Sequence, residues 1–198
     1  FFTLTSSTAA GLITSAYDNG ENFYIHNNKF LIGGVSNSGN HYVLSFNSHQ
    51  NITISNNIFT TNSISTFWYY HGKVINCEST SDVTISNNQF IDINVSANQS
   101  FIVINLSSND GVLIQSNIFK NITSNSKIDG VINYGTSGTD KSIKNNLFYN
   151  ISGGPSSDYL LYGSGAVIVN NTIYGFDDTV LRGGSSNTVI NNIINNSG

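Results

Sequence analysis

The chain has 198 residues, a formal net charge of −4 and only 9% charged residues, with one Cys and no Met. This length fits one domain, and the scattered Lys and Arg exclude the basic patch of a nucleic-acid-binding protein. No apolar run approaches the roughly 20 residues of a membrane-spanning helix, so no membrane span is expected. A composition rich in Asn, Ser and Thr and poor in Lys and Glu favours an extracellular or cell-surface location.

Taken in chain order, a short strand is predicted at 11–17 (GLITSAY), and a repeated unit follows it. The copies share an apolar–polar alternation, a turn that ends in Asn, and a large apolar residue: FYIHNNKF (23–30), ITISNNIF (52–59), VTISNNQF (83–90), VLIQSNIF (112–119), KSIKNNLF (141–148), AVIVNNTI (166–173) and NTVINNII (187–194). The aligned asparagines are Asn28, Asn57, Asn88, Asn117, Asn146, Asn171 and Asn192, at spacings of 29, 31, 29, 29, 25 and 21 residues. A period of this length indicates a repeat architecture.

Each copy predicts two strands joined by a turn. Apolar residues five and three positions before the aligned Asn share one face at period two, which is typical of a strand. The Asn pair favours a turn because Asn tolerates the left-handed region of the backbone. A second strand then places Phe or Ile on the interior side, two positions after the aligned Asn.

A third apolar run follows a variable stretch in each of six copies: YVLSF (42–46), TFWYY (66–70), FIVINL (101–106), GVINY (130–134), YLLY (159–162) and TVLR (179–182). No segment keeps a helical period near 3.6. Identical columns are best explained by parallel strands stacked about 4.8 Å apart, with Phe on Phe and with Asn side chains hydrogen-bonded along the axis. We therefore predict an all-β fold, a right-handed parallel β-helix of about seven coils of three short strands, roughly 34 Å long, that takes in residues 1–198 as one domain.

The segments ITISNNIF, VTISNNQF and KSIKNNLF resemble the coils of the right-handed parallel β-helix, or pectin-lyase-like, superfamily. That superfamily includes polysaccharide lyases, glycoside hydrolases and large adhesin-like repeat proteins of cell surfaces, and the Asn-rich, charge-poor coils resemble the last group most. The resemblance implies that an active site, where there is one, lies on the face of the third strand and its loops.

The acidic pair Asp177–Asp178, with Arg182 four residues later, is the best catalytic candidate in the sequence. The hydrolases that the chain resembles also carry a His-Gly, but His71-Gly72 precedes the acidic pair by four coils, roughly 19 Å along a stacked rod. They carry an Arg-x-Lys as well, which this chain lacks. A polar turn before a strand is the simpler interpretation of the acidic pair, and no metal-ligand spacing or cofactor motif is present.

The aromatic stretch FWYYHG (67–72) suggests a second kind of site. Alternation sends Trp68 and Tyr70 to one face, and exposed aromatic rings offer rigid contact area to sugar rings. The residues expected to bind carbohydrate are Trp68, Tyr70, His71, Tyr134 and Tyr162. Packing in the core and loops, below an insertion that carries the unpaired Cys77, is the alternative.

Outward-facing aliphatic residues next to the Asn turn predict a self-association surface. The candidates are Ile58, Ile118, Leu147, Val167, Val169, Ile190 and Ile193. The chain begins about where its last coil breaks off, so it is expected to be a processed chain, a slice of a longer solenoid, or a unit that joins copies end to end. Asn-X-Ser/Thr sequons occur at Asn51, Asn94, Asn98, Asn105, Asn121, Asn150, Asn170 and Asn195, close to the number that chance gives in this composition.

These features together predict an extracellular structural or adhesive surface protein that associates with copies of itself and has cell-surface glycans as further partners. The alternative is a domain that binds or cleaves polysaccharides. No cofactor is expected in either case.

Overall fold

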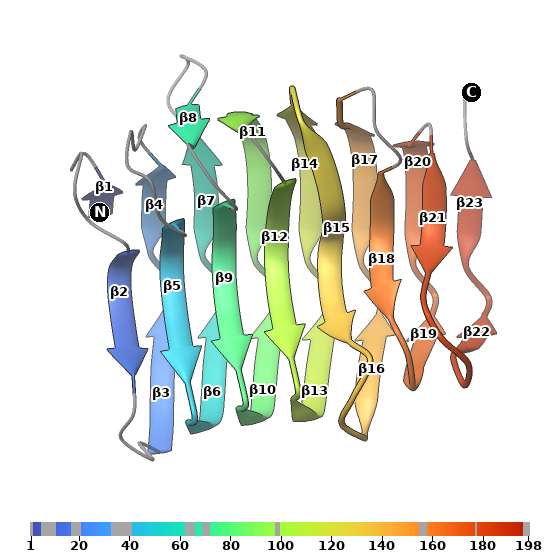
Figure 1. Cartoon of the computed structure of the whole chain (residues 1–198), viewed down its shortest axis with the longest axis horizontal. Coiled ribbons are helices and arrows are strands. Elements are labelled where there is room, and N and C mark those ends of the chain that lie inside the picture. Colours follow the sequence, from blue (N-terminus) through green and yellow to red (C-terminus); the bar gives the residue numbers. More distant parts are fainter. Residues whose placement is uncertain are drawn as a thin grey trace.

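The structure, a computed structural model, describes residues 2–4, 11–16, 21–32, 41–61, 66–68, 72–97, 100–154, 158–176 and 178–195. These residues form strands and turns with no helix, and hence no helix that could cross a membrane. The strands wind into a β-solenoid of three parallel sheets that run the length of the molecule (Figure 1).

Sheet A holds the strands that follow the Asn turn: β1 (Phe2–Leu4), β4 (Lys29–Ile32), β7 (Ile58–Thr61), β11 (Gln89–Ala97), β14 (Ile118–Ser124), β17 (Leu147–Ser152), β20 (Thr172–Phe176) and β23 (Ile193–Asn195), with β8 (Thr66–Trp68) beside β11. Sheet B holds β2 (Gly11–Ala16), β5 (His41–Asn47), β9 (Gly72–Glu78), β12 (Ser100–Ser107), β15 (Lys127–Gly135), β18 (Tyr159–Gly163) and β21 (Thr179–Arg182). Sheet C holds β3 (Glu21–His26), β6 (Gln50–Ser55), β10 (Ser81–Ser86), β13 (Asp110–Gln115), β16 (Lys141–Lys144), β19 (Ala166–Val169) and β22 (Thr188–Ile190). The predicted fold class and three-strand coil are confirmed.

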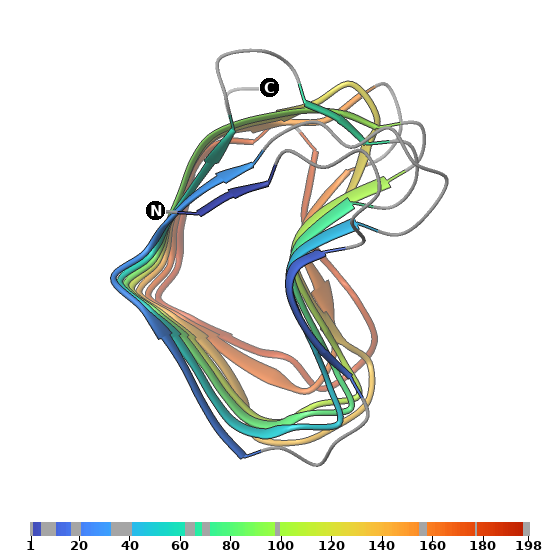
Figure 2. The same ribbon diagram turned by 90° about the vertical axis from the view of Figure 1, so that its left-hand side faces the viewer.

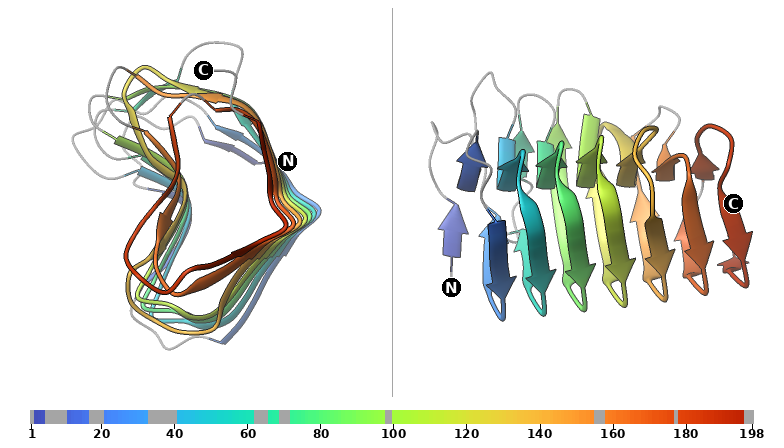
Figure 3. Two further views of the ribbon diagram at one scale, coloured as in Figure 1. Left: turned by 90° about the vertical axis from the view of Figure 1, so that its right-hand side faces the viewer. Right: turned by 90° about the horizontal axis from the view of Figure 1, so that it is seen from below.

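The predicted Asn turn forms the corner between sheets C and A, a sharp vertex that every coil repeats (Figure 3). The first residue of each pair takes the left-handed conformation, with φ between 49° and 58° in all seven copies. Ser116 fills this position in one copy (φ 55°), because the position requires only that conformation.

The second residue of each pair forms a hydrogen-bonded ladder inside the rod. Asn88 donates its backbone N–H and one Nδ2 hydrogen to Oδ1 of Asn117, at 2.9 and 3.1 Å. Its other Nδ2 hydrogen goes to the carbonyl oxygen of Ile54, one coil back, at 2.8 Å. The same pattern joins the successive asparagines from Asn28 to Asn192. Because Asn88 donates both amide hydrogens and its oxygen accepts two bonds, it is stable at 0% exposure.

The core is built from equally regular columns. The rings of Phe30, Phe59, Phe90, Phe119 and Phe148 stack with centroids 4.8 Å apart and planes within 8° of parallel. The isoleucine column of sheet C packs beside them, with Ile54, Ile85 and Ile114 fully buried. Register follows directly, since each strand lies beside its counterpart one coil away (for example Phe90 on Phe119).

The structure corrects the sheet to which one predicted strand was assigned. Residues 66–70 were predicted to belong to the same column as YVLSF and FIVINL, but Thr66–Trp68 forms β8, which pairs with β11 in sheet A. The place in sheet B is taken by β9, Gly72–Glu78. Cys77 is therefore part of a central strand rather than of an insertion; it is free, fully buried, and has a pKa raised by burial.

One lysine lies among the core residues. Lys141 occupies the column that holds Val83 and Val112 in other coils, and only 2% of it is exposed. Its Nζ donates to the carbonyl oxygens of Gly135, Ser137 and Ser164, and loss of hydration lowers its pKa. Backbone acceptors at the corner between sheets B and C therefore satisfy this buried cation.

Candidate glycan-binding groove on sheet B

The outer surface of sheet B is concave, because its strands bend toward the interior of the rod (Figure 2). At the bend, two consecutive residues point inward instead of alternating: Val74 and Ile75 in β9, and Val103 and Ile104 in β12, are all fully buried. The bend leaves a groove of about 530 Å³ across the strands, parallel to the solenoid axis.

One residue per coil follows the inward pair, and four of these residues line the groove: Asn105, Asn133, Tyr162 and Arg182. We refer to all the residues at this position as the groove column, and their register is continuous from strand to strand: Ser45, Asn76, Asn105, Asn133, Tyr162 and Arg182. Asn105 donates from Nδ2 to Oδ1 of Asn76 at 2.8 Å, and Asn76 to Oγ of Ser45 at 3.3 Å. The column therefore contains three carboxamides in a row: Asn76 and Asn105 are only 3% and 4% exposed, whereas Asn133 is half-buried and can bind a sugar hydroxyl as donor or acceptor.

Cations and tyrosines lie at both ends of the groove. Lys73 Nζ lies 5.5 Å from the centroid of the Tyr42 ring, and its ion pair with Glu78 spans 3.3 Å. Toward the other end, the Tyr159 ring contacts two cations, with Lys127 Nζ 4.8 Å and the Arg182 guanidinium 4.3 Å from its centroid. These contacts hold the basic side chains against aromatic rings instead of leaving them free in solvent.

Tyr162 offers an aromatic surface inside the groove. It is half-buried, and its ring lies 6.1 Å from the ring of Tyr159 at an interplanar angle of 28°. Tyr159 itself is only 6% exposed, so its ring supports the site from below and Tyr162 is the ring that a ligand can reach.

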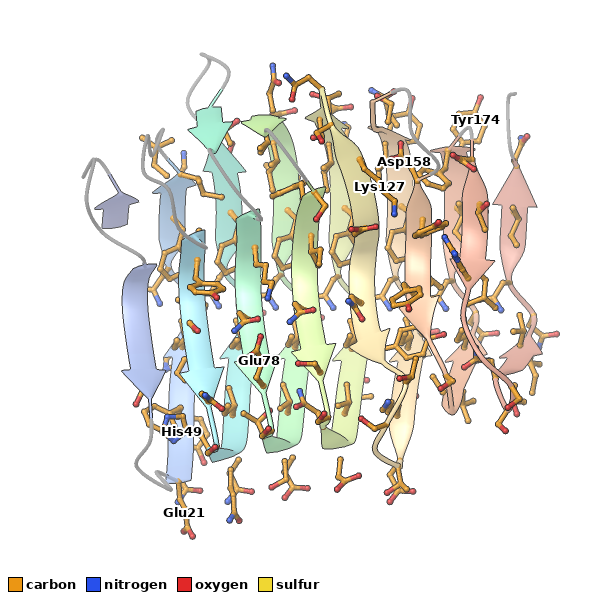
Figure 4. The ribbon with its side chains drawn as sticks, in the orientation of Figure 1. Glu21, His49, Glu78, Lys127, Asp158 and Tyr174 are labelled. Atoms are coloured by element: carbon orange, nitrogen blue, oxygen red, sulfur yellow. The ribbon has the colours of Figure 1, made fainter. Side chains whose placement is uncertain are left out.

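The two acids that line the groove do not face each other. Asp129 pairs with Lys127 at the start of β15, and Glu78 lies at the end of β9 (Figure 4). In the strand register, Glu78 and Asp129 are five positions apart along the strand direction, which corresponds to roughly 16 Å. Glycoside hydrolysis requires carboxylates about 5 to 9.5 Å apart. Glu78 and Asp129 therefore do not form a hydrolytic pair.

Of the acidic pair Asp177–Asp178, the structure describes Asp178, and this residue has a structural role. Asp178 accepts hydrogen bonds from the backbone N–H of Asp158 at 2.7 Å and of Thr179 at 2.7 Å. The bond from Asp158 is the main cause of its lowered pKa, and a carboxylate held ionised in this way is a poor proton donor. Asp177 lies outside the described residues, and Arg182 belongs to the groove column.

The aromatic candidates fall into three groups. Tyr162 lies in the groove as predicted for a sugar-binding residue. Tyr134 does not, because it is fully buried in the core, where burial raises its pKa to about 12. Tyr70 and His71 lie outside the described residues, and the backbone of Trp68 belongs to sheet A rather than sheet B.

The sequon asparagines differ in accessibility. Asn105 is only 4% exposed in the groove column, so attachment of a glycan there would disrupt its bond to Asn76. Asn121 and Asn150 form a second, outer ladder on sheet A, in which Asn150 donates to Asn121 and Asn121 to Asp92, at 2.9 and 2.8 Å. Asn51, Asn94, Asn170 and Asn195 are exposed, and Asn98 lies outside the described residues.

The sequence prediction missed most of the groove, although a signal was present. The motif Val-Ile-Asn occurs at 74–76, 103–105 and 131–133, and it marks the inward pair and the asparagine of the groove column in three successive strands of sheet B. No cluster of three potential metal ligands exists among the described side chains.

Comparison of the chain with protein-family models, with curated protein sequences and with solved structures gives no match.

Proposed function

We propose that this protein is a non-catalytic glycan-binding β-solenoid of an extracellular or cell-surface protein, and that an extended polysaccharide lies in the groove of sheet B. The observation that carries the proposal is the groove column, where hydrogen-bonding carboxamides lead to an accessible tyrosine and an arginine. A concave surface with a few convergent polar groups and aromatic rings is the usual form of a ligand site.

The direction of the groove favours a polymer over a small sugar. The groove crosses the strands, so that a chain laid along it meets an equivalent position of the next coil about every 4.8 Å. An extended chain can therefore contact Asn133, Tyr162 and Arg182 in turn, since these residues line the groove on three successive strands. This adhesive role agrees with the resemblance of the coils to adhesin-like members of the pectin-lyase-like superfamily.

Binding without cleavage is supported by the acids of the groove. Glu78 and Asp129 each pair with a lysine and lie far apart, and Asp178 is occupied by backbone donors. The cleaving alternative would require a general acid and a second carboxylate, or a base beside a stabilised anion.

The test is affinity electrophoresis or calorimetry with neutral and acidic polysaccharides, comparing the natural chain with Tyr162→Ala. Loss of a stacking ring should reduce the binding free energy by about 1 kcal/mol, which corresponds to roughly fivefold weaker binding. Tyr149→Ala is the matched control, because Tyr149 is an exposed tyrosine on sheet A, away from the groove. Equal affinity of Tyr162→Ala and the natural chain, or no binding to any polysaccharide, would contradict the proposal.

A second measurement separates binding from cleavage. We expect no new reducing ends and no unsaturated products after long incubation with the polysaccharides that bind. Turnover that disappears in Asp178→Asn would show instead that the protein is an enzyme.

A further inference from the structure

The groove on sheet B has a charge opposite in sign to that of the whole chain. Three of the seven Lys and Arg residues line it, namely Lys73, Lys127 and Arg182, together with two acids, Glu78 and Asp129. The lining therefore has a formal charge of +1, whereas the chain has −4. A cleft lined by positive charge in an acidic protein attracts anionic ligands and gives neutral ones no such advantage.

The positive charge of the groove that lacks a counter-ion belongs to Arg182. Glu78 pairs with Lys73 and Asp129 with Lys127, so that each of these two pairs is neutral. Within the described part of the chain, Arg182 has no ion pair with a carboxylate and donates no hydrogen bond. The only arginine of the sequence is therefore the group of the groove that is free to bind an anion.

The ring of Tyr159 holds this guanidinium in place. Arg182 Cζ lies 4.3 Å from the centroid of the ring, and Lys127 Nζ lies 4.8 Å from it. The two cations come from the strands on either side of β18, Arg182 from β21 and Lys127 from β15 (Figure 4). A guanidinium held over an aromatic ring needs no oxygen acceptor from the protein, so its N–H donors remain available to a ligand. Arg182 is also exposed, so a ligand can reach it.

The accessible tyrosine of the groove lies next to this arginine. Tyr162 and Arg182 are register partners on β18 and β21, and neighbouring strands are about 4.8 Å apart. A sugar ring that stacks on Tyr162 therefore has its substituents within reach of the guanidinium. The planar fork of guanidinium N–H groups binds a carboxylate or a similar oxyanion through two parallel hydrogen bonds.

We propose that the ligand of this groove is an acidic glycan, and that Arg182 binds a carboxylate or sulfate group of the sugar that stacks on Tyr162. This inference rests on the glycan-binding function proposed above and specifies the class of its ligand. The two acids of the groove oppose such a polymer little, because Lys73 and Lys127 neutralise them. Since charge-assisted hydrogen bonds are stronger than neutral ones, Arg182 is the residue that selects acidic over neutral glycans.

Matched pairs of polymers test the class of ligand. Alginate, hyaluronate and chondroitin sulfate can each be compared by calorimetry with the same polymer after reduction of its carboxylates to alcohols and removal of its sulfate esters. We expect at least one acidic polymer to bind, and its neutral counterpart to bind roughly tenfold more weakly, because hydrogen bonds to charged groups are lost. Added salt should weaken the binding of the acidic polymer more than that of the neutral one. Equal or lower affinity for the acidic member of every pair, or no binding at all, would overturn the proposal.

Substitution of the arginine tests its role directly. Arg182→Gln should weaken the binding of the acidic polymer roughly tenfold, and Arg182→Lys should restore only part of the affinity, because an ammonium group lacks the planar fork. Lys29→Gln is the matched control, since it removes the same charge from an exposed position on β4 in sheet A, away from the groove. Equal losses in Arg182→Gln and Lys29→Gln would refute a local role for Arg182.

The results separate this inference from the function on which it rests. If Tyr162→Ala weakens binding but both members of each polymer pair bind equally well, the groove binds glycans and their acidic class is refuted. If none of the polymers, acidic or neutral, binds to the natural chain, the glycan-binding function is refuted together with the ligand class.

Discussion

Removal of one side chain from the Asn ladder tests how much the ladder contributes to stability. In Asn117→Ala, the backbone N–H and one Nδ2 hydrogen of Asn88 lose their acceptor, since both bond to Oδ1 of Asn117. The carbonyl oxygen of Ile85 and Oδ1 of Asn146 each lose a donor at 2.9 and 3.0 Å. Asn117 is 1% exposed and Asn88 0%, so water does not replace these partners without a rearrangement of the corner.

The magnitude follows from the two buried donors of Asn88. A buried donor left without an acceptor costs about 1 to 3 kcal/mol, so Asn117→Ala should lower the free energy of unfolding by about 4 kcal/mol. Ser116→Gly is the control at the adjacent position. Its φ of 55° suits glycine, and the substitution should leave stability unchanged or raise it by less than about 1 kcal/mol.

The assay is urea denaturation followed by far-ultraviolet circular dichroism. Because repeat proteins can unfold in parts, hydrogen exchange of the amides in the flanking coils should accompany it. We expect the loss of protection to be largest at the backbone amide of Asn88. A change in unfolding free energy below about 1 kcal/mol for Asn117→Ala would refute the view that the ladder stabilises the rod.

Three further predictions concern other parts of the structure. Phe90→Ala, in the middle of the Phe stack, should lower the free energy of unfolding by about 3 to 5 kcal/mol, whereas Phe90→Leu should cost much less; equal losses in chemical denaturation would contradict the packing argument. The folded-state pKa of Asp178 is lowered, so its contribution to stability is present above its unfolded pKa and is lost as the pH falls through the folded value. Asp178→Asn should therefore flatten the acid limb of a plot of melting temperature against pH. An unaltered acid limb would contradict this contribution of Asp178. Cys77, whose pKa is raised by burial, should react with a thiol reagent only after unfolding, and rapid labelling of the native protein would show that its strand opens.

The main features of the solenoid could be predicted because each depends on residues close together in the sequence. The left-handed turn at Asn56 and the inward positions of Ile54 and Phe59 follow from local backbone preference and from period-two alternation. Repetition of these features at a nearly constant period then permits one efficient arrangement, the stacking of like residues. The buried Asn ladder follows from this stacking.

Strict alternation does not hold at the bend of sheet B. At the bend of sheet B, Val74 and Ile75 both face the core, so a strict period of two assigns the next residues to the wrong side. The strand at 66–68 was placed in the wrong sheet, because the aromatic residues of TFWYY are compatible with either sheet and only the pairing with β11 decides between them.

The sequence by itself determined the coil, the corner and the columns of the core, because these depend on short-range backbone preference and on a repeat that stacks upon itself. Outside the Asn corner, only the tertiary structure decided which polar residues meet across coils. The groove column joins residues from Ser45 to Arg182 through strand register and a shared bend, neither of which is encoded at any single position. The same holds for the outward aliphatic residues, because the Asn corner separates Leu147 on sheet A from Val167 on sheet C although both are exposed.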